Sequence, residues 1–303
     1  MKVRSILCPT DFSDFSDRAL EHAAAMARWY GAELTIVHSY PYAVVGRGAP
    51  YFRSGVALDA STRAQLLKEL EAAAEPVRAA GVKPSLVLLE GDPSDEILKR
   101  ARAVPTDLIV MGTHGLRGVD RWLLGSVAAR IVEKAACAVL TVPQPPEGTR
   151  PSAALYETIL CPVDLVGSAA TLEAASSIAR AAKARLIALH VLEDLPQYEA
   201  AAGMAHIDWA EFREGMEREA LDRLRRAADQ ACGGAAPECL VRSGKPYREI
   251  LKLAQSNGAS LIVMGIHGRK PLERFFFGST TLQVVRQARC PVWTVRAPAG
   301  RVE

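Results

Sequence analysis

The sequence predicts an α/β protein with two tandem domains, each built on a five-stranded parallel sheet flanked by helices. Three observations support this prediction. Short apolar segments alternate with segments of helical periodicity along the chain, which is the pattern of a doubly wound parallel sheet. The same residues return at a fixed spacing in the second half. A segment with regularly spaced glycines follows an apolar run in each half.

The internal repeat defines the domain organisation. Residues that recur 153 positions later are Cys8 as Cys161, Asp11 as Asp164, Pro93 as Pro246, Gly112 as Gly265, Gly125 as Gly278 and Cys137 as Cys290. A repeat of this length indicates two copies of a whole domain and not a solenoid. The segment 143–154 is rich in proline and lacks an apolar period, which is typical of a linker. We therefore expect domains at residues 1–143 and 155–298.

The individual elements follow from the apolar pattern. In the first half we expect strands at 3–8, 33–38, 85–90, 107–111 and 138–142, and helices at 16–30, 59–80, 92–103 and 126–136. Pro76 is expected to kink or end the second helix. Residues 40–57 have no period and are interpreted as a mobile loop. In the second half we expect strands at 158–163, 185–191, 238–242, 260–264 and 291–295, with a long helix near 208–231 among the connecting helices.

Composition excludes several classes of protein. The 303 residues are 49% hydrophobic and carry a formal net charge of +3, with no dense basic cluster that would indicate nucleic-acid binding. No apolar run is long enough for a membrane span, and the first residues do not resemble a signal peptide. The six cysteines form no C-x-x-C pair, so we expect buried, reduced thiols in a cytoplasmic protein.

The glycine-rich segments carry the strongest functional signal. Residues 111–126 read MGTHGLRGVDRWLLGS and residues 264–279 read MGIHGRKPLERFFFGS, so both have the form G-x-x-G, nine residues, G-S. Such glycines allow positive φ angles and close approach, and the start of the following helix offers free N–H groups and a positive dipole. This is how a backbone is shaped to hold phosphates. The segments are neither a P-loop nor a G-x-G-x-x-G fingerprint.

The position of these segments in the fold supports a ligand site. In a doubly wound sheet, ligands bind beyond the carboxyl ends of the strands, where the strand order reverses. The glycine segments follow the fourth strand of each half, and Asp11 and Asp164 follow the first strand, so all should lie at the same edge. A carboxylate suits ribose hydroxyls or an exocyclic amine, whereas serine and backbone N–H groups suit phosphate.

Both halves resemble the universal stress protein family, in its tandem, ATP-binding form, through this glycine signature and the aspartate after the first strand. The resemblance implies a Rossmann-like (adenine nucleotide alpha hydrolase-like) fold in each half and ATP, with Mg²⁺, as the ligand. In the first half it implies binding by Asp11, Ser39, Gly112, His114, Gly115, Gly125, Ser126 and Val127. In the second half it implies binding by Asp164, Val191, Gly265, His267, Gly268, Gly278, Ser279 and Thr280. Ser39 and Val191, taken as the residues just after the second strand, would meet adenine through their backbone.

The histidines admit more than one role. His114 and His267 occupy matching positions, and a general-base role is open because histidine titrates near neutrality. No acidic orienter or nucleophile is placed nearby by sequence, which favours shaping the loop or contacting the ligand. His38 and His190 end the second strands and are expected to be buried and hydrogen-bonded. The cysteines that precede proline are expected to pack, and no His/Cys spacing supports a zinc site.

The two halves differ at the expected sites. Residues 11–13 match the Asp-x-Ser of the family, whereas residues 164–166 are Asp-Leu-Val and lack the hydroxyl. We therefore predict that the first site binds ATP more tightly than the second. Basic residues inside the glycine segments either meet phosphates or are simply solvated. They are Arg117, Arg121, Arg269 and Lys270.

The resulting interpretation is an adenine-nucleotide-binding, nucleotide-dependent regulator of the stress response with at most slow hydrolysis. One alternative is a weak ATPase or nucleotidyl enzyme, although residues 10–14 and 164–167 lack the serine-glycine-rich loop of such folds. The other is a nucleotide-free protein-interaction module that uses residues 40–57. The last strands are expected to pack as an internal pseudo-dimer. A further homodimer and an unknown protein partner remain open.

Overall fold

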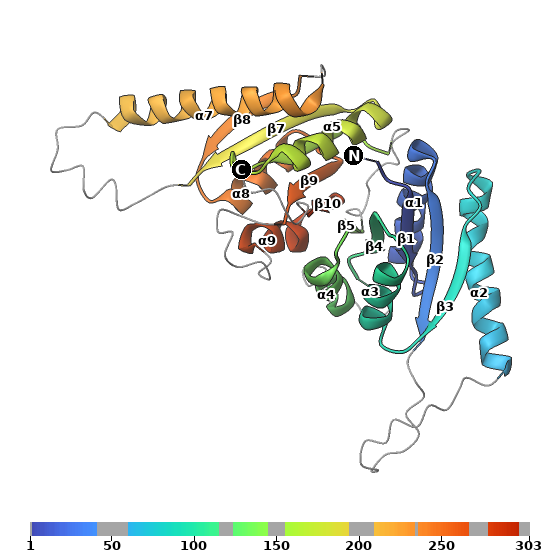
Figure 1. Cartoon of the computed structure of the whole chain (residues 1–303). Helices are drawn as coiled ribbons and strands as arrows, with labels where there is room; N and C mark the ends of the chain where they lie inside the picture. Colours follow the sequence, from blue (N-terminus) through green and yellow to red (C-terminus); the bar gives the residue numbers. More distant parts are fainter. Residues whose placement is uncertain are drawn as a thin grey trace, which may run out of the picture. The chain divides into compact units, whose positions relative to one another are not determined.

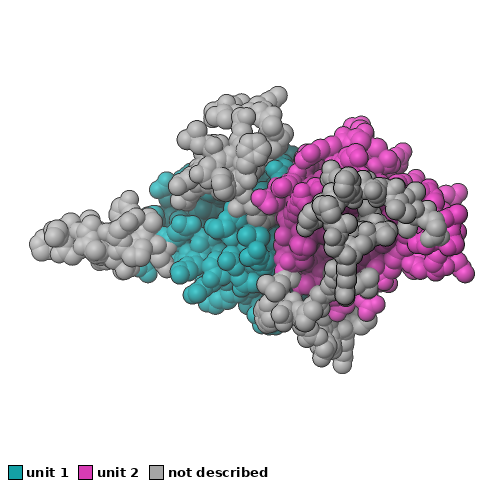
Figure 2. All heavy atoms as spheres, turned by 90° about the horizontal axis from the view of Figure 1, so that it is seen from below, with its two compact units in different colours: residues 1, 145–303 teal, residues 2–144 magenta. Residues whose placement is uncertain are grey.

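The computed structural model describes residues 2–40, 60–114, 124–144, 155–193, 209–233, 236–266 and 278–296 (Figure 1). The chain divides into two compact units (Figure 2). The N-terminal unit comprises residues 2–144, and the C-terminal unit comprises residues 145–303 together with Met1. Each unit is an α/β structure with a parallel sheet between helices, which confirms the predicted fold class. The expected pseudo-dimer stays a prediction.

The N-terminal unit contains a five-stranded parallel sheet. Its strands are β1 (Ser5–Pro9), β2 (Glu33–Tyr40), β3 (Ser85–Glu90), β4 (Leu108–Gly112) and β5 (Ala138–Val142), and its helices are α1 (Asp14–Tyr30), α2 (Ala60–Ala79), α3 (Pro93–Ala103) and α4 (Ser126–Lys134). The strand order is β3-β2-β1-β4-β5. The order therefore reverses between β1 and β4, and the carboxyl ends of these two strands flank the point where such sheets bind ligands.

Apolar patterning explains the layers of this unit. The four apolar residues of β4 are buried, as expected for a parallel strand covered on both faces. Helices α1 and α2 pack against each other on one face of the sheet, and α3 and α4 do so on the other (Figure 1). Helix α1 begins after Ser13, whose side chain caps it, and ends at Gly31 with a φ of 62°.

The C-terminal unit repeats this architecture. Its strands are β6 (Thr158–Pro162), β7 (Arg185–Leu192), β8 (Glu238–Ser243), β9 (Leu261–Gly265) and β10 (Val292–Val295), and its helices are α5 (Ala169–Ala182), α7 (Trp209–Cys232), α8 (Pro246–Ser256) and α9 (Ser279–Gln287). The strand order is β8-β7-β6-β9-β10, all parallel, so the order reverses between β6 and β9. Helices α5 and α7 pack together on one face, and α8 and α9 on the other.

Two expectations about element ends were wrong. The sequence left a kink or an early end at Pro76 open, and the early end is wrong because helix α2 continues to Ala79; the kink stays a prediction. Pro76 and Ala72 are both exposed, so water can reach the carbonyl that the proline ring leaves without its helical donor. Arg78 also forms ion pairs of 2.6 Å with Glu71 and Glu75, which span this turn.

The second strand of each unit extends further than expected. Strand β2 ends at Tyr40 and β7 at Leu192, because the neighbouring strands pair with them up to these residues. Ser39 and Val191 therefore lie inside the strands and not just after them. The other expected ends agree within two residues. Residues 41–57 of the expected mobile loop lie outside the described residues.

The cysteines are free thiols, three of them buried (Cys8, Cys161 and Cys232) and three half-buried. Burial raises the pKa of Cys8 and Cys161 far above the usual range, and that of Cys290 to about 12. A thiol held protonated in this way packs and does not react as a thiolate, as expected for the cysteines before proline. No helix in the part of the chain that the structure describes is long and apolar enough to cross a membrane.

Candidate functional site

The candidate site of the N-terminal unit lies where β1 and β4 end side by side. The two strands are paired in parallel, with Leu7 opposite Ile109. Asp11 follows β1 by two residues, and Gly112 is the last residue of β4. Two segments that are far apart in the sequence therefore meet at the strand-order reversal, as predicted.

The turn after β1 is built around Asp11 and Ser13. The Ser13 hydroxyl donates to Oδ1 of Asp11 over 2.5 Å, and the Ser13 backbone N–H donates to the same atom over 3.2 Å. The Ser13 Oγ also accepts from the backbone N–H of Ser16 and so caps α1. The Asp-x-Ser pair thus fixes the carboxylate at the sheet edge and starts the helix, which is a structural reason for the serine.

An aromatic contact closes this turn against β2. Phe12 has a φ of 62°, and its ring stacks on that of His38 with centroids 4.4 Å apart. Nδ1 of His38 lies 2.8 Å from the carbonyl oxygen of Thr10 and must donate, because a carbonyl only accepts. His38 is hydrogen-bonded as expected but only half-buried.

Close packing explains two of the signature glycines. A Cβ on Gly112 would lie 3.0 Å from both Cβ and the carbonyl oxygen of Phe15 in α1. A Cβ on Gly125 would lie 3.1 Å from the carbonyl oxygen of Thr113, to which the Gly125 N–H donates over 2.8 Å. Gly125 has a φ of −56° and Gly278 a φ of −58°. Of the two reasons for glycine given by the sequence, a positive φ and close approach, close approach therefore applies at position 125.

The N-terminus of α4 offers donors for an anion. Gly125 is its N-cap residue and provides no side-chain hydrogen bond, so the first N–H groups lack the capping partner that most helices have. Ser126 is exposed and Val127 half-buried at this end. Arg130, one turn further on, is held by α3, because its guanidinium pairs with Asp95 over 2.6 Å. Among the described residues, the donors at this helix start are thus the backbone and the Ser126 hydroxyl.

His114 is placed against the same edge by packing. Its Nδ1 lies 3.0 Å from Oγ1 of Thr113, and its ring lies against that of Phe15 with centroids 5.3 Å apart. Its Nε2 is buried and has no hydrogen-bond partner within the described ranges. The contacts with Thr113 and Phe15 support the shaping role. Ser39 lies further along the edge and donates from Oγ to the carbonyl oxygen of Gly91 over 3.2 Å.

The C-terminal unit places its predicted residues in the same way. A Cβ on Gly265 would lie 3.3 Å from Oγ1 of Thr171, and Oγ1 of Thr281 donates to the Gly265 carbonyl over 3.0 Å. Helix α9 begins after Gly278, again without a side-chain cap. Ser279 and Thr280 lie in its first turn. Asp164 follows β6 and Val191 is buried within β7.

A cavity of about 290 Å³ opens at this edge of the C-terminal unit. The sheet side contributes Asp164, Leu165, Val166, His190 and Leu192. The side contributed by α7 consists of Met216, Glu219, Ala220 and Arg223. Sequence reasoning missed the α7 residues. Their spacing places them on one helix face, but only the fold reveals that this face meets the strand ends.

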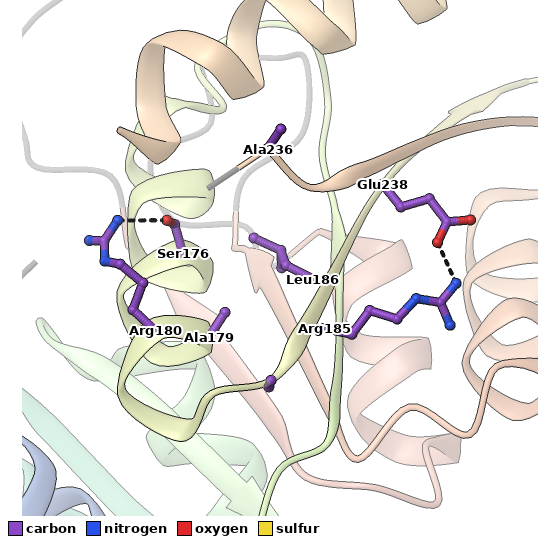
Figure 3. Close-up of a pocket in the computed structure, with 8 residues that line it drawn as sticks. Ser176, Ala179, Arg180, Arg185, Leu186, Ala236 and Glu238 are labelled. Atoms are coloured by element: carbon purple, nitrogen blue, oxygen red, sulfur yellow. Dashed lines mark hydrogen bonds and ion pairs between the residues drawn. The ribbon is translucent and has the colours of Figure 1, made fainter. Parts of the chain in front are cut away.

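A larger cavity of about 450 Å³ lies at the opposite edge, beside the amino end of β7 (Figure 3). Its polar groups are already paired with each other. Arg180 donates to the Ser176 hydroxyl over 3.0 Å and to the carbonyl of Cys232 over 3.1 Å, and Arg185 forms an ion pair with Glu238. It is distant along the strands from Asp164, so it does not belong to the candidate site.

Some of the predicted residues lie outside the described residues. They are Gly115, His267, Gly268, Arg117, Arg121, Arg269 and Lys270. Within the described residues, no group of three or more histidine, cysteine or acidic side chains could hold a metal ion. The described site therefore consists of an acidic turn, a close-packed glycine, a helix start without a side-chain cap and, in the C-terminal unit, a cavity.

Comparison with known proteins identifies the family of this chain. The sequence profile of the universal stress protein family matches residues 2–143 and again residues 155–296. The chain belongs to the universal stress protein family. It carries two copies of the family's domain in tandem, as the sequence predicted.

Relatives of this universal stress protein occur in archaea and bacteria. A universal stress protein of Methanocaldococcus jannaschii is 36% identical over 145 residues, which cover 47% of this chain and 83% of that protein. Another, of Thermus aquaticus, is 36% identical over 140 residues, which cover 46% of this chain and 98% of that protein. A crystal structure of a universal stress protein from Archaeoglobus fulgidus shares the fold across both units, with 97% of each chain covered, a TM-score of 0.66 and 21% identity.

Proposed function

We propose that each domain binds an adenine nucleotide, ATP together with Mg²⁺, at the carboxyl edge of its sheet. One observation carries this proposal. Asp11, Gly112 and the start of α4 at Ser126 meet at the strand-order reversal of the N-terminal unit, and the N-cap residue of this helix, Gly125, makes no side-chain cap. The C-terminal unit repeats the arrangement with Asp164, Gly265 and the start of α9.

The chemistry of these groups suits the two ends of a nucleotide. The carboxylate of Asp11 can accept hydrogen bonds from ribose hydroxyls or an exocyclic amine. The first N–H groups of α4, the Ser126 hydroxyl and the positive end of the helix dipole favour phosphate oxygens. Gly112 lets α1 pack closely against the end of β4, since a Cβ there would lie 3.0 Å from both Cβ and the carbonyl oxygen of Phe15. The ligand would therefore lie across the reversal, with its phosphates at the helix.

A divalent cation would be held mainly through the ligand. No cluster of three potential metal ligands exists in the described parts of the chain. Mg²⁺ commonly keeps several waters and binds through phosphates with one or two carboxylates. The cation would supply charge neutralisation of the phosphates, while the protein would supply the helix N-terminus and the hydroxyl of Ser126.

We further propose that the protein acts in the cytoplasm as a nucleotide-dependent regulator of the stress response, with at most slow hydrolysis. The environment of His114 supports the second point, because its described contacts are a hydroxyl and an aromatic ring rather than a carboxylate that would orient a general base. Domain limits at 1–143 and 155–298, and an unidentified protein partner, belong to the same proposal.

The first experiment identifies any nucleotide that the purified protein carries. Denaturation should release ATP, which mass spectrometry then identifies. About two ATP molecules per chain are expected if both sites bind with micromolar affinity or better. Calorimetry with ATP and Mg²⁺ then measures binding to the intact chain. The double variant Gly125→Ala, Gly278→Ala should lose binding. The matched control is Gly215→Ala, because Gly215 lies in α7 with open space around its Cβ position.

Two results would point to the alternatives. Turnover of ATP to ADP by the wild-type chain, abolished in the double variant, would favour an enzyme. An absence of ATP both in the purified protein and in the calorimeter would refute nucleotide binding and favour a protein-interaction module.

A further inference from the structure

The start of α3 carries acidic residues that hold α4 in the N-terminal unit. Asp95 forms an ion pair of 2.6 Å with Arg130 of α4, and Asp92 lies 3.6 Å from the same guanidinium. The hydroxyl of Ser94 also accepts a hydrogen bond of 3.0 Å from Arg130. Arg130 follows Ser126 by one turn, about 6 Å along the helix from the proposed phosphate site. In this group of side chains, two carboxylates thus outnumber one guanidinium.

The C-terminal unit reverses the charges at the matching positions. Helices α8 and α9 have the same lengths as α3 and α4, 11 and 9 residues, and α8 packs on α9 as α3 packs on α4. Lys245 takes the position of Asp92, and Arg248 takes that of Asp95. Because position 95 contacts α4 one turn after its start, Arg248 stands beside the first turns of α9. Two cations therefore replace two carboxylates next to the second helix start.

These two cations are not neutralised within the part of the unit that the structure describes. Lys245 and Arg248 are exposed, and neither forms an ion pair with a described carboxylate. Arg248 donates from Nε to the hydroxyl of Tyr247 over 3.0 Å, and its guanidinium lies 5.8 Å from the centre of that ring. Gln283 replaces the arginine of α4 and accepts a hydrogen bond of 2.7 Å from Gln287 of its own helix. The positive charges thus stay available to a ligand.

This difference changes how each unit can compensate the charge of a triphosphate. Beside the N-terminal site, the excess of carboxylate repels phosphate oxygens and favours a divalent cation, because Mg²⁺ binds through phosphates together with one or two carboxylates. Beside the C-terminal site, ammonium and guanidinium groups on long side chains attract the phosphate oxygens directly. The protein itself therefore supplies the positive charge at α9 that an added cation must supply at α4.

We infer that the C-terminal site keeps its affinity for ATP when Mg²⁺ is removed, whereas the N-terminal site requires the cation, with Lys245 and Arg248 setting the difference. This inference rests on the proposed nucleotide binding. Both sites accept ATP together with Mg²⁺, and they differ in what happens without it. A fall in free Mg²⁺ would then empty the N-terminal site first and leave the C-terminal site filled.

The test is calorimetry with ATP, in Mg²⁺ and in EDTA, on two full-length chains. Gly125→Ala leaves the C-terminal site, and Gly278→Ala leaves the N-terminal site. Removal of Mg²⁺ should weaken the N-terminal site by about tenfold or more and the C-terminal site by less than about threefold. In the Gly125→Ala chain, Arg248→Asp installs the residue of the N-terminal unit and should raise the loss to about tenfold. The matched control is Lys252→Asp, an exposed position further along α8, which should keep the loss below about threefold.

The outcomes separate this inference from the proposed function. An equal loss at the two sites in EDTA, or a C-terminal response that Arg248→Asp leaves unchanged, would overturn the inference and leave nucleotide binding intact. An absence of ATP binding by the wild-type chain under both conditions would overturn the proposed function itself. If the acidic variant fails to fold, Lys245→Gln with Arg248→Gln removes both charges at exposed positions. This variant should show the same loss, and an unchanged affinity in EDTA would contradict the role of the two cations.

Discussion

Replacing Gly112 with alanine should destabilise the N-terminal unit by about 1–3 kcal/mol, the usual cost of overpacking. The added Cβ would lie 3.0 Å from both Cβ and the carbonyl oxygen of Phe15. This is about 0.5 Å closer than the optimal separation of carbon atoms. One of the two atoms belongs to the backbone of α1, so relief requires a shift of the helix and not merely of a side chain. Because α1 follows the Asp11 turn, the same shift should weaken ATP binding to this unit.

The C-terminal unit provides a matched control with the same local sequence. Both glycines end an LIVMG strand, but a Cβ on Gly265 would meet only Oγ1 of Thr171, at 3.3 Å. A threonine side chain can give by a few tenths of an ångström at small cost, and alanine lowers the entropy of the unfolded chain. We therefore expect Gly265→Ala to change stability by less than about 1 kcal/mol.

Hydrogen exchange measured by mass spectrometry on the full chain reports on each unit separately. Gly112→Ala should speed exchange in β1, β4 and α1 by roughly fivefold to a hundredfold, in line with the free-energy change. Gly265→Ala should leave β6, β9 and α5 close to wild type. Equal effects in the two units, or a larger effect of Gly265→Ala, would show that contact with the α1 backbone is not what makes Gly112 necessary.

Three further predictions concern the turns, a buried histidine and the two sites. Ser13→Ala should lower the free energy of unfolding, measured with urea, by about 1 kcal/mol because the cap of α1 is lost. Ser168→Ala is the control and should change it little, because Ser168 caps α5 without a side-chain hydrogen bond. Equal losses in the two variants would contradict this reasoning. Burial, with a smaller effect of Arg18, lowers the pKa of His22 to about 3. Below about pH 6.5, His22 is therefore protonated in the unfolded chain but stays neutral in the folded chain. As the pH is lowered from 6.5 to 3, the free energy of unfolding should fall by up to about 1.4 kcal/mol per pH unit. His22→Leu should flatten this dependence measured by urea unfolding, and an unchanged pH profile would refute it. Finally, Gly125→Ala should reduce total ATP affinity in calorimetry more than Gly278→Ala if the Asp11–Ser13 pair makes the N-terminal site the tighter one; the reverse order would show that the cavity of the C-terminal unit matters more.

Local sequence patterns determined the order of strands and helices in both units. Apolar runs of strand length and helical stripes are short-range features, so β1 to β5 and their repeat could be predicted with ends wrong by at most two residues. The same holds for the described ends of the glycine segments, at Gly112, Gly125, Gly265 and Gly278, and for Asp11 and Asp164. In a parallel, doubly wound sheet the ends of the first and fourth strands must meet, so the edge that holds the candidate site was predictable as well.

Tertiary structure decided what each residue does at that edge. Gly112 must be glycine because Phe15 of α1 passes 3.0 Å from its Cβ position, and Gly125 because the Thr113 carbonyl lies 3.1 Å away. Ser39 falls within β2 because β3 pairs with that strand up to Tyr40. The cavity of the C-terminal unit depends on how α7, a helix remote in sequence, packs across the strand ends. Such contacts join residues that no local pattern relates, which is why the sequence determined the place of the site while the folded chain determined its shape.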